Sequence, residues 1–274
     1  MIQSSYLKLQ NHKQFMNPRI KDLNKVLPIN ELYTCVQGEG SRAGRPTVAI
    51  RTTGCTHRCF FGDGGWCDSW HSSIHPEKGK FSFQDIVDIY DQNPQIKEMM
   101  LTGGSPTMHP TLINELTHFC RSRDIIMTIE TEGSHFVKTD YLIGLLSISP
   151  KFSNSTPKVG TVTPMGKVAD EKMIIQHNKY RMNYHDIQQM INYHVDYQIK
   201  PVVNPVRDPE TWSEVEEFLT KLKIPKNKVY IMPPGDSKEE LEKIYGEIMN
   251  WCRDNGYNFT GRPHIIAFNK ERFV

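Results

Sequence analysis

The chain alternates short β-rich runs with longer segments of helical spacing, and this alternation restricts the fold more than any other feature. The predicted strands are residues 47–51, 99–102, 125–129, 145–149, 194–203 and 228–232. The predicted helices are residues 82–90, with Ser82 as N-cap, and 110–121, 180–193, 209–221 and 238–253. Strands that alternate with helices predict an α/β fold with a parallel sheet.

The 274 residues fit one large domain or two small ones. No convincing linker is present, so we predict a single domain over residues 29–274. Residues 1–28 are polar and mixed in charge, and we expect them to form an N-terminal extension that acts as a packing or dimer-contact arm. A long irregular stretch, about residues 152–172, is typical of a functional or mobile loop.

Charge and hydropathy exclude several classes of protein. The net charge of +2 and the lack of a basic stripe argue against a nucleic-acid partner. Apolar runs such as Val48-Ala49-Ile50 are too short to span a bilayer, and residues 1–30 lack the apolar core of a signal peptide. We therefore expect a cytoplasmic protein whose six cysteines are reduced, metal-bound or buried.

Unusual residues recur where the predicted strands end. These ends carry a cysteine loop after the first strand, Thr102-Gly103-Gly104-Ser105-Pro106, Glu130-Thr131-Glu132-Gly133, Ser149-Pro150-Lys151, Lys200 and Met232-Pro233-Pro234-Gly235. Ligands of parallel α/β proteins bind at the carboxyl ends of strands. The joint placement of these motifs predicts one shared pocket there.

The cysteine loop holds Cys55, Cys59 and Cys67. A structural zinc site or an ordinary iron–sulfur cluster takes four protein ligands, so three thiolates leave one metal position open for a small molecule. The alternative is a set of buried thiols, or a zinc site that borrows His57 or His71. Cys35, Cys120 and Cys252 receive no role, since cysteines are often core residues.

These motifs, in this order, resemble the radical S-adenosylmethionine (SAM) superfamily and, within it, the 7-carboxy-7-deazaguanine synthase family. The resemblance covers residues 31–274 and includes Gln37-Gly38-Glu39-Gly40, Arg51 before Gly54-Cys55, Cys67-Asp68-Ser69, Thr102-Gly103-Gly104, Ser149-Pro150-Lys151, residues 153–157, Tyr197-Gln198-Ile199-Lys200, Met232-Pro233-Pro234-Gly235 and residues 262–274. It implies a partial (β/α)6-type barrel.

The resemblance also implies a reaction. Members of the family are lyases that convert 6-carboxy-5,6,7,8-tetrahydropterin into 7-carboxy-7-deazaguanine with loss of ammonia. They use a [4Fe-4S] cluster, SAM and Mg²⁺, a flavodoxin- or ferredoxin-like electron donor, and a homodimeric assembly. A different ring rearrangement within the superfamily, an activase, or a zinc-stabilised nucleic-acid-binding protein are the alternatives.

The resemblance assigns roles to individual residues. Three irons fall to Cys55, Cys59 and Cys67, and the fourth takes SAM. Contacts to SAM are implied for Trp66, Cys67, Asp68, Gly103, Gly104, Glu130, Ser149, Pro150, Lys151 and Lys200. Ser69, where the family has Thr, is the implied Mg²⁺ ligand. Substrate contacts are implied for Val36, Gln37, Gly38, Glu39, Arg51, Thr102 and Val274.

Some of these residues have a second interpretation, and the chain departs from the family at others. Arg51 is either a clamp for the substrate carboxylate or part of a structural salt bridge, and Lys200 either contacts SAM or is a solvated strand end. Seven residues separate Cys59 from Cys67, which is not the usual superfamily spacing. Ser105 stands where the superfamily usually has Glu, so a charged acceptor near the SAM ammonium is missing unless backbone carbonyls replace it.

Overall fold

A six-stranded sheet forms the centre of the computed structural model, which describes residues 22–62 and 65–274. The strands lie side by side in chain order: β1 (Ile29–Val36), β2 (Pro46–Thr52), β3 (Glu98–Thr102), β4 (Ile126–Thr131), β5 (Leu145–Ile148) and β6 (Tyr197–Ile199). Neighbours from β2 to β6 pair in parallel, whereas β1 pairs antiparallel with β2. The predicted α/β fold in a single domain is confirmed, with one antiparallel edge strand added.

The sequence interpretation missed β1. Its residues Asn30 and Glu31 are polar, and both are buried. Because consecutive polar residues interrupt the apolar pattern that signals a strand, the segment reads as a loop. The burial of these two side chains depends on tertiary partners, His71 and Ser72 for Asn30 and Arg51 for Glu31.

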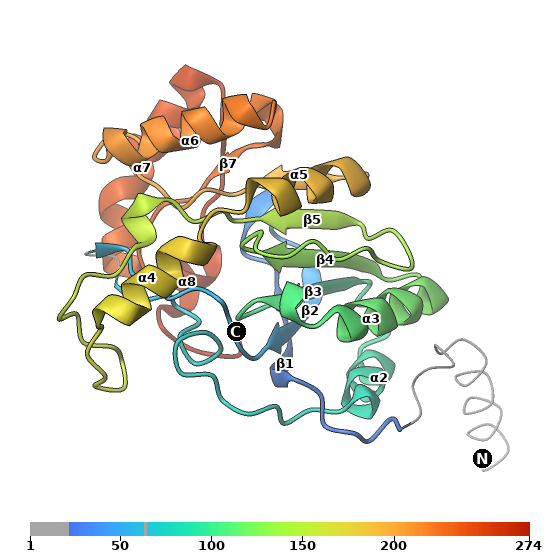
Figure 1. Cartoon of the computed structure of the whole chain (residues 1–274). Coiled ribbons are helices and arrows are strands. Elements are labelled where there is room, and N and C mark those ends of the chain that lie inside the picture. The colour runs from blue at the N-terminus through green and yellow to red at the C-terminus, as the bar shows by residue number, and fades with distance from the viewer. Residues whose placement is uncertain (1–21, 63–64) are drawn as a thin grey trace, which may run out of the picture.

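Helices cover the sheet: α2 (Phe83–Gln92), α3 (Pro110–Arg123), α4 (Glu171–Tyr180), α5 (Tyr184–Tyr193), α6 (Pro209–Lys221), α7 (Lys238–Asn255) and α8 (Pro263–Phe268). Figure 1 shows α2, α3 and α5 beside the strands, and α6 and α7 above β5 and α5 in this view. Ser82 caps α2 as predicted, in a reciprocal capping box with Asp85. Phe83 of α2 and Phe119 of α3 pack edge to face in the core, with ring centroids 5.7 Å apart.

Two predicted elements are wrong in their extent. The helix predicted over residues 180–193 begins later, as α5 at Tyr184, because Asn183 accepts a hydrogen bond from the Asp186 backbone and caps its first turn; Tyr180 is the last residue of α4. Helix α4 lies mostly outside the predicted helix, and it begins inside the stretch predicted to be irregular. Asp170 caps its first turn.

The two predicted strands near the end of the sheet are also shorter than expected. Only Tyr197–Ile199 of residues 194–203 is a strand, and only Tyr230–Ile231 (β7) of residues 228–232. Pro201 has no N–H to donate, which breaks the ladder. Isolated parallel bridges still join Ile199 to Val229 and Val202 to Met232. β7 itself pairs with β8 (Asn258–Phe259), which the sequence pattern did not reveal.

The two ends of the described chain lie in different places. Most of the predicted N-terminal extension, residues 1–21, lies outside the described residues; of the remainder, Leu27 donates its N–H to the Phe81 carbonyl at 2.8 Å. The last residues return to the carboxyl ends of the strands, where Figure 1 marks the end beside β1. Arg272 there pairs with Glu31 of β1, and the Phe273 ring contacts Tyr33. In the part of the chain that the structure describes, no helix combines the length and apolar character needed to cross a membrane.

Candidate active site

A cavity of about 450 Å³ lies at the carboxyl ends of the strands. All site residues predicted from the sequence line it except Pro150. They come from β1, the loop after β2, the turns after β3 and β4, the segments after β5 and β6, and residues 262–274. The expectation of one shared pocket at the strand ends is therefore confirmed.

The loop after β2 carries the three thiols into this cavity. Phe60 and Trp66, which flank the middle of this loop, form an isolated antiparallel β-bridge, and their ring centroids lie 5.1 Å apart. The Cys67 N–H donates to the Cys59 carbonyl at 3.0 Å. Cys59 and Cys67 are therefore neighbours despite the unusual spacing between them in the sequence.

Burial dominates the electrostatics of the thiols. It raises the pKa of Cys55, Cys59 and Cys67, and in Cys55 the nearby Glu132 carboxylate raises the pKa further. The Cys55 sulfur accepts a backbone hydrogen bond from His57 at 3.4 Å. Thiols held in this way as neutral acids need a metal to become thiolates, since a bound cation favours their charged form.

One group of possible metal ligands lies close together. Among the described residues, ligand atoms of Cys55, His57 and Glu132 lie within 4.8 Å of one another. His71, the other histidine considered for a zinc site, instead lies 3.0 Å from Glu31 and away from this group. A cluster binds each cysteine to a different iron, so the three thiols of a cluster site need not meet at one point.

Charged side chains also line the cavity. We call Cys55, Cys59, Cys67 and Glu132 its thiol wall, and Glu31, Glu39, Arg51, Glu130 and Lys200 its charged wall. Lys200 is only 3% exposed and donates to Glu39 at 2.5 Å and Glu130 at 2.9 Å. Burial lowers the pKa of Lys200, but the two carboxylates outweigh it and raise the pKa above its usual value. Lys200 is therefore a buried cation, and the alternative of a solvated strand end is wrong.

Arg51 has both of the features considered for it. It lines the cavity, and its Nε donates to Glu31 at 2.7 Å while Nη1 donates to Ser69 at 2.5 Å. Its Nη2 reaches only the Tyr33 hydroxyl, at 3.4 Å. Burial raises the pKa of Glu31, but His71, Arg51 and Arg272 outweigh it and bring the pKa to about 2.

Arg262 joins the charged wall to Asp68, which follows Cys67 in the chain. It donates to Glu39 at 3.0 Å and to Asp68, and its Nη1 donates to the Gly235 carbonyl at 2.5 Å. The sequence pointed to Arg262-Pro263-His264 as a motif but gave these residues no role. Glu31, an acidic residue within a strand, is another member that sequence reasoning missed.

The two glycines after β3 are required by close packing. A Cβ on Gly103 would lie 1.7 Å from Cγ of Arg51, and one on Gly104 would lie 2.2 Å from the Gly54 carbonyl oxygen. Both have positive φ, which favours glycine. The glycine pair therefore packs the β3 turn against Arg51 and the start of the cysteine loop. Next to it, the Thr102 hydroxyl donates to Glu130 at 2.9 Å.

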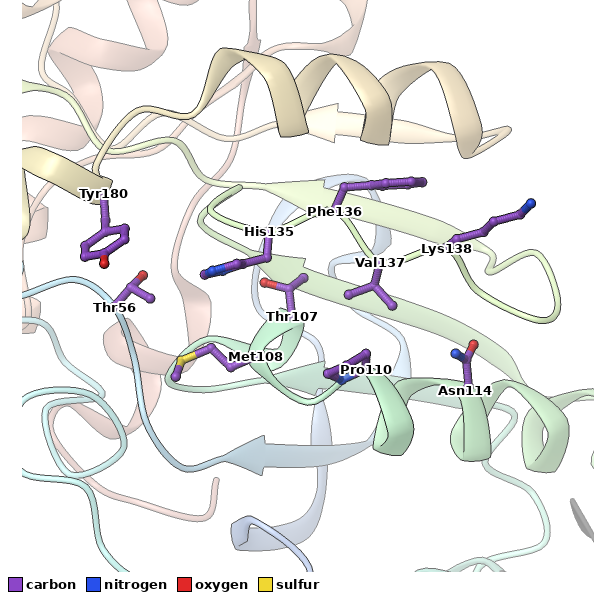
Figure 2. Close-up of a pocket in the computed structure, with 10 residues that line it drawn as sticks. All are labelled: Thr56, Thr107, Met108, Pro110, Asn114, His135, Phe136, Val137, Lys138 and Tyr180. Atoms are coloured by element: carbon purple, nitrogen blue, oxygen red, sulfur yellow. The ribbon is translucent and has the colours of Figure 1, made fainter. Parts of the chain in front are cut away.

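A second, open groove of about 570 Å³ lies beside the cavity. Figure 2 shows the side chains that line it: Thr56, Thr107, Met108, Pro110, Asn114, His135, Phe136, Val137, Lys138 and Tyr180. It contains none of the predicted site residues, and it brings together no buried charges or thiols. We therefore place the chemistry in the smaller cavity.

Comparison with known proteins leads to the same family that the sequence motifs resemble. A 7-carboxy-7-deazaguanine synthase of Halobacterium salinarum is 32% identical over 249 residues, which span 89% of this chain and 91% of the relative. The synthase of Rhodopirellula baltica is 30% identical over 246 residues, spanning 90% and 88%. No family model matches the chain.

Solved structures agree in fold. The crystal structure of QueE from Escherichia coli superposes with a TM-score of 0.57 at 20% identity, covering 86% of this chain and 93% of that chain. At this identity the likeness concerns the fold alone. The curated relatives carry the assignment further, because they match over nearly their full length, and this chain belongs to the 7-carboxy-7-deazaguanine synthase family.

Proposed function

We propose that this chain is a radical SAM lyase that converts 6-carboxy-5,6,7,8-tetrahydropterin into 7-carboxy-7-deazaguanine with loss of ammonia. The observation that carries the proposal is that one cavity is lined both by three cysteine thiols and by a set of largely buried ion pairs. The thiols suit a cluster, and the charged wall suits a polar heterocycle with a carboxylate.

Cys55, Cys59 and Cys67 would hold a [4Fe-4S] cluster whose fourth iron takes the amino and carboxylate groups of SAM. When bound and reduced, this pair supplies the 5′-deoxyadenosyl radical that removes a hydrogen atom from the substrate. The chain supplies the surroundings of that chemistry. Trp66, Gly103, Gly104, Ser149 and Lys151 line the same cavity and are the proposed SAM contacts; Lys151 donates to the Ser149 hydroxyl at 2.8 Å.

The substrate would lie against β1 and β2. Glu39 still has free lone pairs beside Lys200 and Arg262, and it can accept from the N–H groups of a pterin edge. Arg51 has spare donors on its Nη atoms for the substrate carboxylate, because Tyr33 is only a distant partner. Val36, Gln37, Gly38, Thr102 and Val274 complete the proposed substrate contacts.

Magnesium would bind at Ser69, whose hydroxyl already has two partners. The proposed ligand Ser69 donates to Asp68 at 3.1 Å and accepts from Arg51 at 2.5 Å. A cation cannot bind the Ser69 oxygen while a guanidinium occupies it. We therefore propose that Mg²⁺ binds Ser69 only when Arg51 turns toward the substrate carboxylate, and that Mg²⁺ binding accordingly tightens in the presence of substrate.

The direct test is the reaction itself. Anaerobically reconstituted and reduced protein, incubated with SAM, Mg²⁺ and carboxytetrahydropterin, should release 7-carboxy-7-deazaguanine, detected by mass. SAM cleavage without this product would show that the substrate is a different one, for example in another ring rearrangement or in activation of a partner protein.

The proximity of Cys55, His57 and Glu132 favours zinc as the competing metal. Metal analysis separates the two cases. A cluster gives about four irons and four sulfides per chain with broad visible absorption. Stoichiometric zinc without iron would reject the cluster, and with it the proposed reaction.

Further proposals rest on the family resemblance. We propose a flavodoxin- or ferredoxin-like electron donor, a homodimer, and a division of the chain into residues 1–28 and a radical SAM domain over residues 29–274. We also propose a cytoplasmic location, where cysteines such as these six are kept out of disulfides and can bind metal.

A further inference from the structure

Glu132 is a buried carboxylate whose environment differs from that of its neighbours. It follows β4, is 6% exposed and lines the cavity. Its Oε1 accepts hydrogen bonds from the hydroxyls of Ser105 at 2.6 Å, of Ser134, and of Thr56 at 3.4 Å. Its Oε2 has only the distant Thr131 hydroxyl, at 3.5 Å. One oxygen is therefore crowded with donors, and the other has room for a further donor.

Four other carboxylates of the cavity each have a cation. Glu31 pairs with Arg51, Glu39 and Glu130 with Lys200, and Asp68 with Arg262. Among residues 22–62 and 65–274, no lysine or arginine lies within ion-pair distance of Glu132, and the nearest basic group is His57 at 3.9 Å. A carboxylate buried without a cation is unfavourable. The cavity at Glu132 therefore favours a ligand that brings an N–H donor polarised by a nearby positive charge, such as a metal-bound amine.

The position of Glu132 indicates which ligand group this is. Its carboxylate lies within 4.8 Å of the Cys55 sulfur, at the thiol end of the cavity. Ser105 occupies the place where the family resemblance leads us to expect a glutamate, and this serine is fully buried and does not line the cavity. The Ser105 hydroxyl is too short to act as an acceptor for a ligand there, but it donates to Glu132 and holds this carboxylate in position.

We propose that Glu132, positioned by Ser105, is the residue that accepts a hydrogen bond from the amino group of SAM in this chain. The inference rests on the proposed function. It places the carboxylate acceptor after β4, at Glu132, because position 105 after β3 is a serine. An amino group whose lone pair binds iron keeps N–H donors, and Oε2 of Glu132 is the acceptor with room for one. A metal ion shared by Cys55, His57 and Glu132 would instead remove Cys55 from the cluster.

The test compares two ligands on the cluster-loaded protein. SAM carries the amino group, whereas 5′-methylthioadenosine keeps the adenosine and the methylated sulfur, as a neutral thioether, and lacks the amino-acid part. In Glu132→Gln, which keeps shape and removes charge, SAM should bind about 10- to 100-fold more weakly, since a charge-assisted hydrogen bond is lost. Binding of 5′-methylthioadenosine should stay unchanged. Iron content and thermal midpoint are measured alongside.

Two results would overturn the assignment. Equal affinity for SAM in wild type and Glu132→Gln means that the carboxylate does not contact the amino group. Equal weakening of both ligands means that Glu132 acts only through the shape of the site. If Glu132→Gln does not fold, Ser105→Ala takes its place, and we expect a smaller loss for SAM, about threefold to tenfold, with none for 5′-methylthioadenosine. If Ser105→Ala binds both ligands as tightly as the wild type does, the role of Ser105 is rejected.

Different results would reject the proposed function itself. Wild-type protein that takes up no iron, or that takes up a cluster but binds no SAM, rejects the proposed function before any variant is compared. Wild-type protein that binds SAM through its cluster, alongside a Glu132→Gln variant that binds it equally well, rejects only the role of Glu132.

Discussion

The two walls of the cavity differ in whether their charged and metal-binding groups have partners within the chain. On the charged wall, Glu31, Glu39 and Glu130 are each paired with an arginine or lysine. On the thiol wall, Cys55 is half-buried, and within residues 22–62 and 65–274 the basic group within ion-pair distance of the buried Glu132 is His57, at 3.9 Å. The charged wall is stable by itself and presents a fixed surface, whereas the thiol wall depends on a bound cofactor to satisfy its groups.

We infer that the charged wall recognises the substrate and that the thiol wall holds the cofactor. Preorganised ion pairs recognise a polar substrate with little rearrangement, because their partners already hold them in place. The thiols do the opposite, since burial keeps them protonated until a metal binds. Variants of the two walls should therefore fail in different ways: changes on the charged wall should lower stability, and changes on the thiol wall should remove the cofactor and leave the fold.

The largest effect is expected from Cys55→Ala. One cluster ligand is lost, so iron should fall from about four atoms per chain to near zero, and visible absorption and product formation should disappear. Far-ultraviolet circular dichroism of the protein without cofactor should match that of the wild type. Retained iron would show that this thiol is not a ligand, and loss of the fold would place the thiol wall in the structural core instead.

On the charged wall, Lys200→Met should lower the free energy of unfolding by about 3–5 kcal/mol, because Glu39 and Glu130 would stay buried without their shared cation. Urea unfolding measures the change. The matched control is Lys228→Met, which breaks the pair with Asp196 at the surface and should change stability by less than about 1 kcal/mol. Similar losses in the two variants would mean that burial does not distinguish these pairs.

A pH dependence follows from Glu31. Its pKa is about 2 in the folded chain against an ordinary value of 4.5, so its contribution is complete above about pH 4.5 and is lost as the pH falls toward 2. The full contribution is about 3 kcal/mol. Glu31→Gln should be less stable than wild type at pH 7 by a similar amount, and the gap should narrow between pH 5 and pH 3. A gap that is constant with pH would show that the carboxylate is not charged in the fold.

The smallest effect concerns the junction between the walls. Gly103→Ala places a Cβ against Arg51, whereas Gly166→Ala, also at positive φ, has open space around it. Both variants share the strain of a left-handed alanine, about 1 kcal/mol. Gly103→Ala should lose about 1–3 kcal/mol more, because Arg51 must move. Equal unfolding free energies in the two variants would mean that Arg51 gives way freely.

Much of this arrangement could be predicted from the sequence. The helix over residues 209–221 and the strands after which the site residues lie follow local periodicity, and their order along the chain sets the order of the sheet. Site residues on successive parallel strands then meet at one edge without further information. The three cysteines and the glycine pair mark that edge because their residue types are unusual there.

The remainder depends on contacts between distant segments. Strand β1 was hidden because Glu31 is polar, and its burial requires Arg51 and Arg272, which lies 241 residues further along the chain. Arg262 and Glu132 likewise gain their roles only when the fold brings Asp68 and Ser105 beside them. Local sequence pattern contains no signal for such pairs.

The central claim is that the thiol wall is completed by an iron–sulfur cluster to which SAM binds directly. Electron paramagnetic resonance of the reduced, reconstituted protein tests it, because a ligand on iron changes the spectrum of the cluster. We predict a cluster signal that shifts when SAM is added and does not shift with 5′-methylthioadenosine. A cluster spectrum that stays the same at SAM concentrations that saturate binding, or a protein that holds zinc and gives no such signal, would contradict the account.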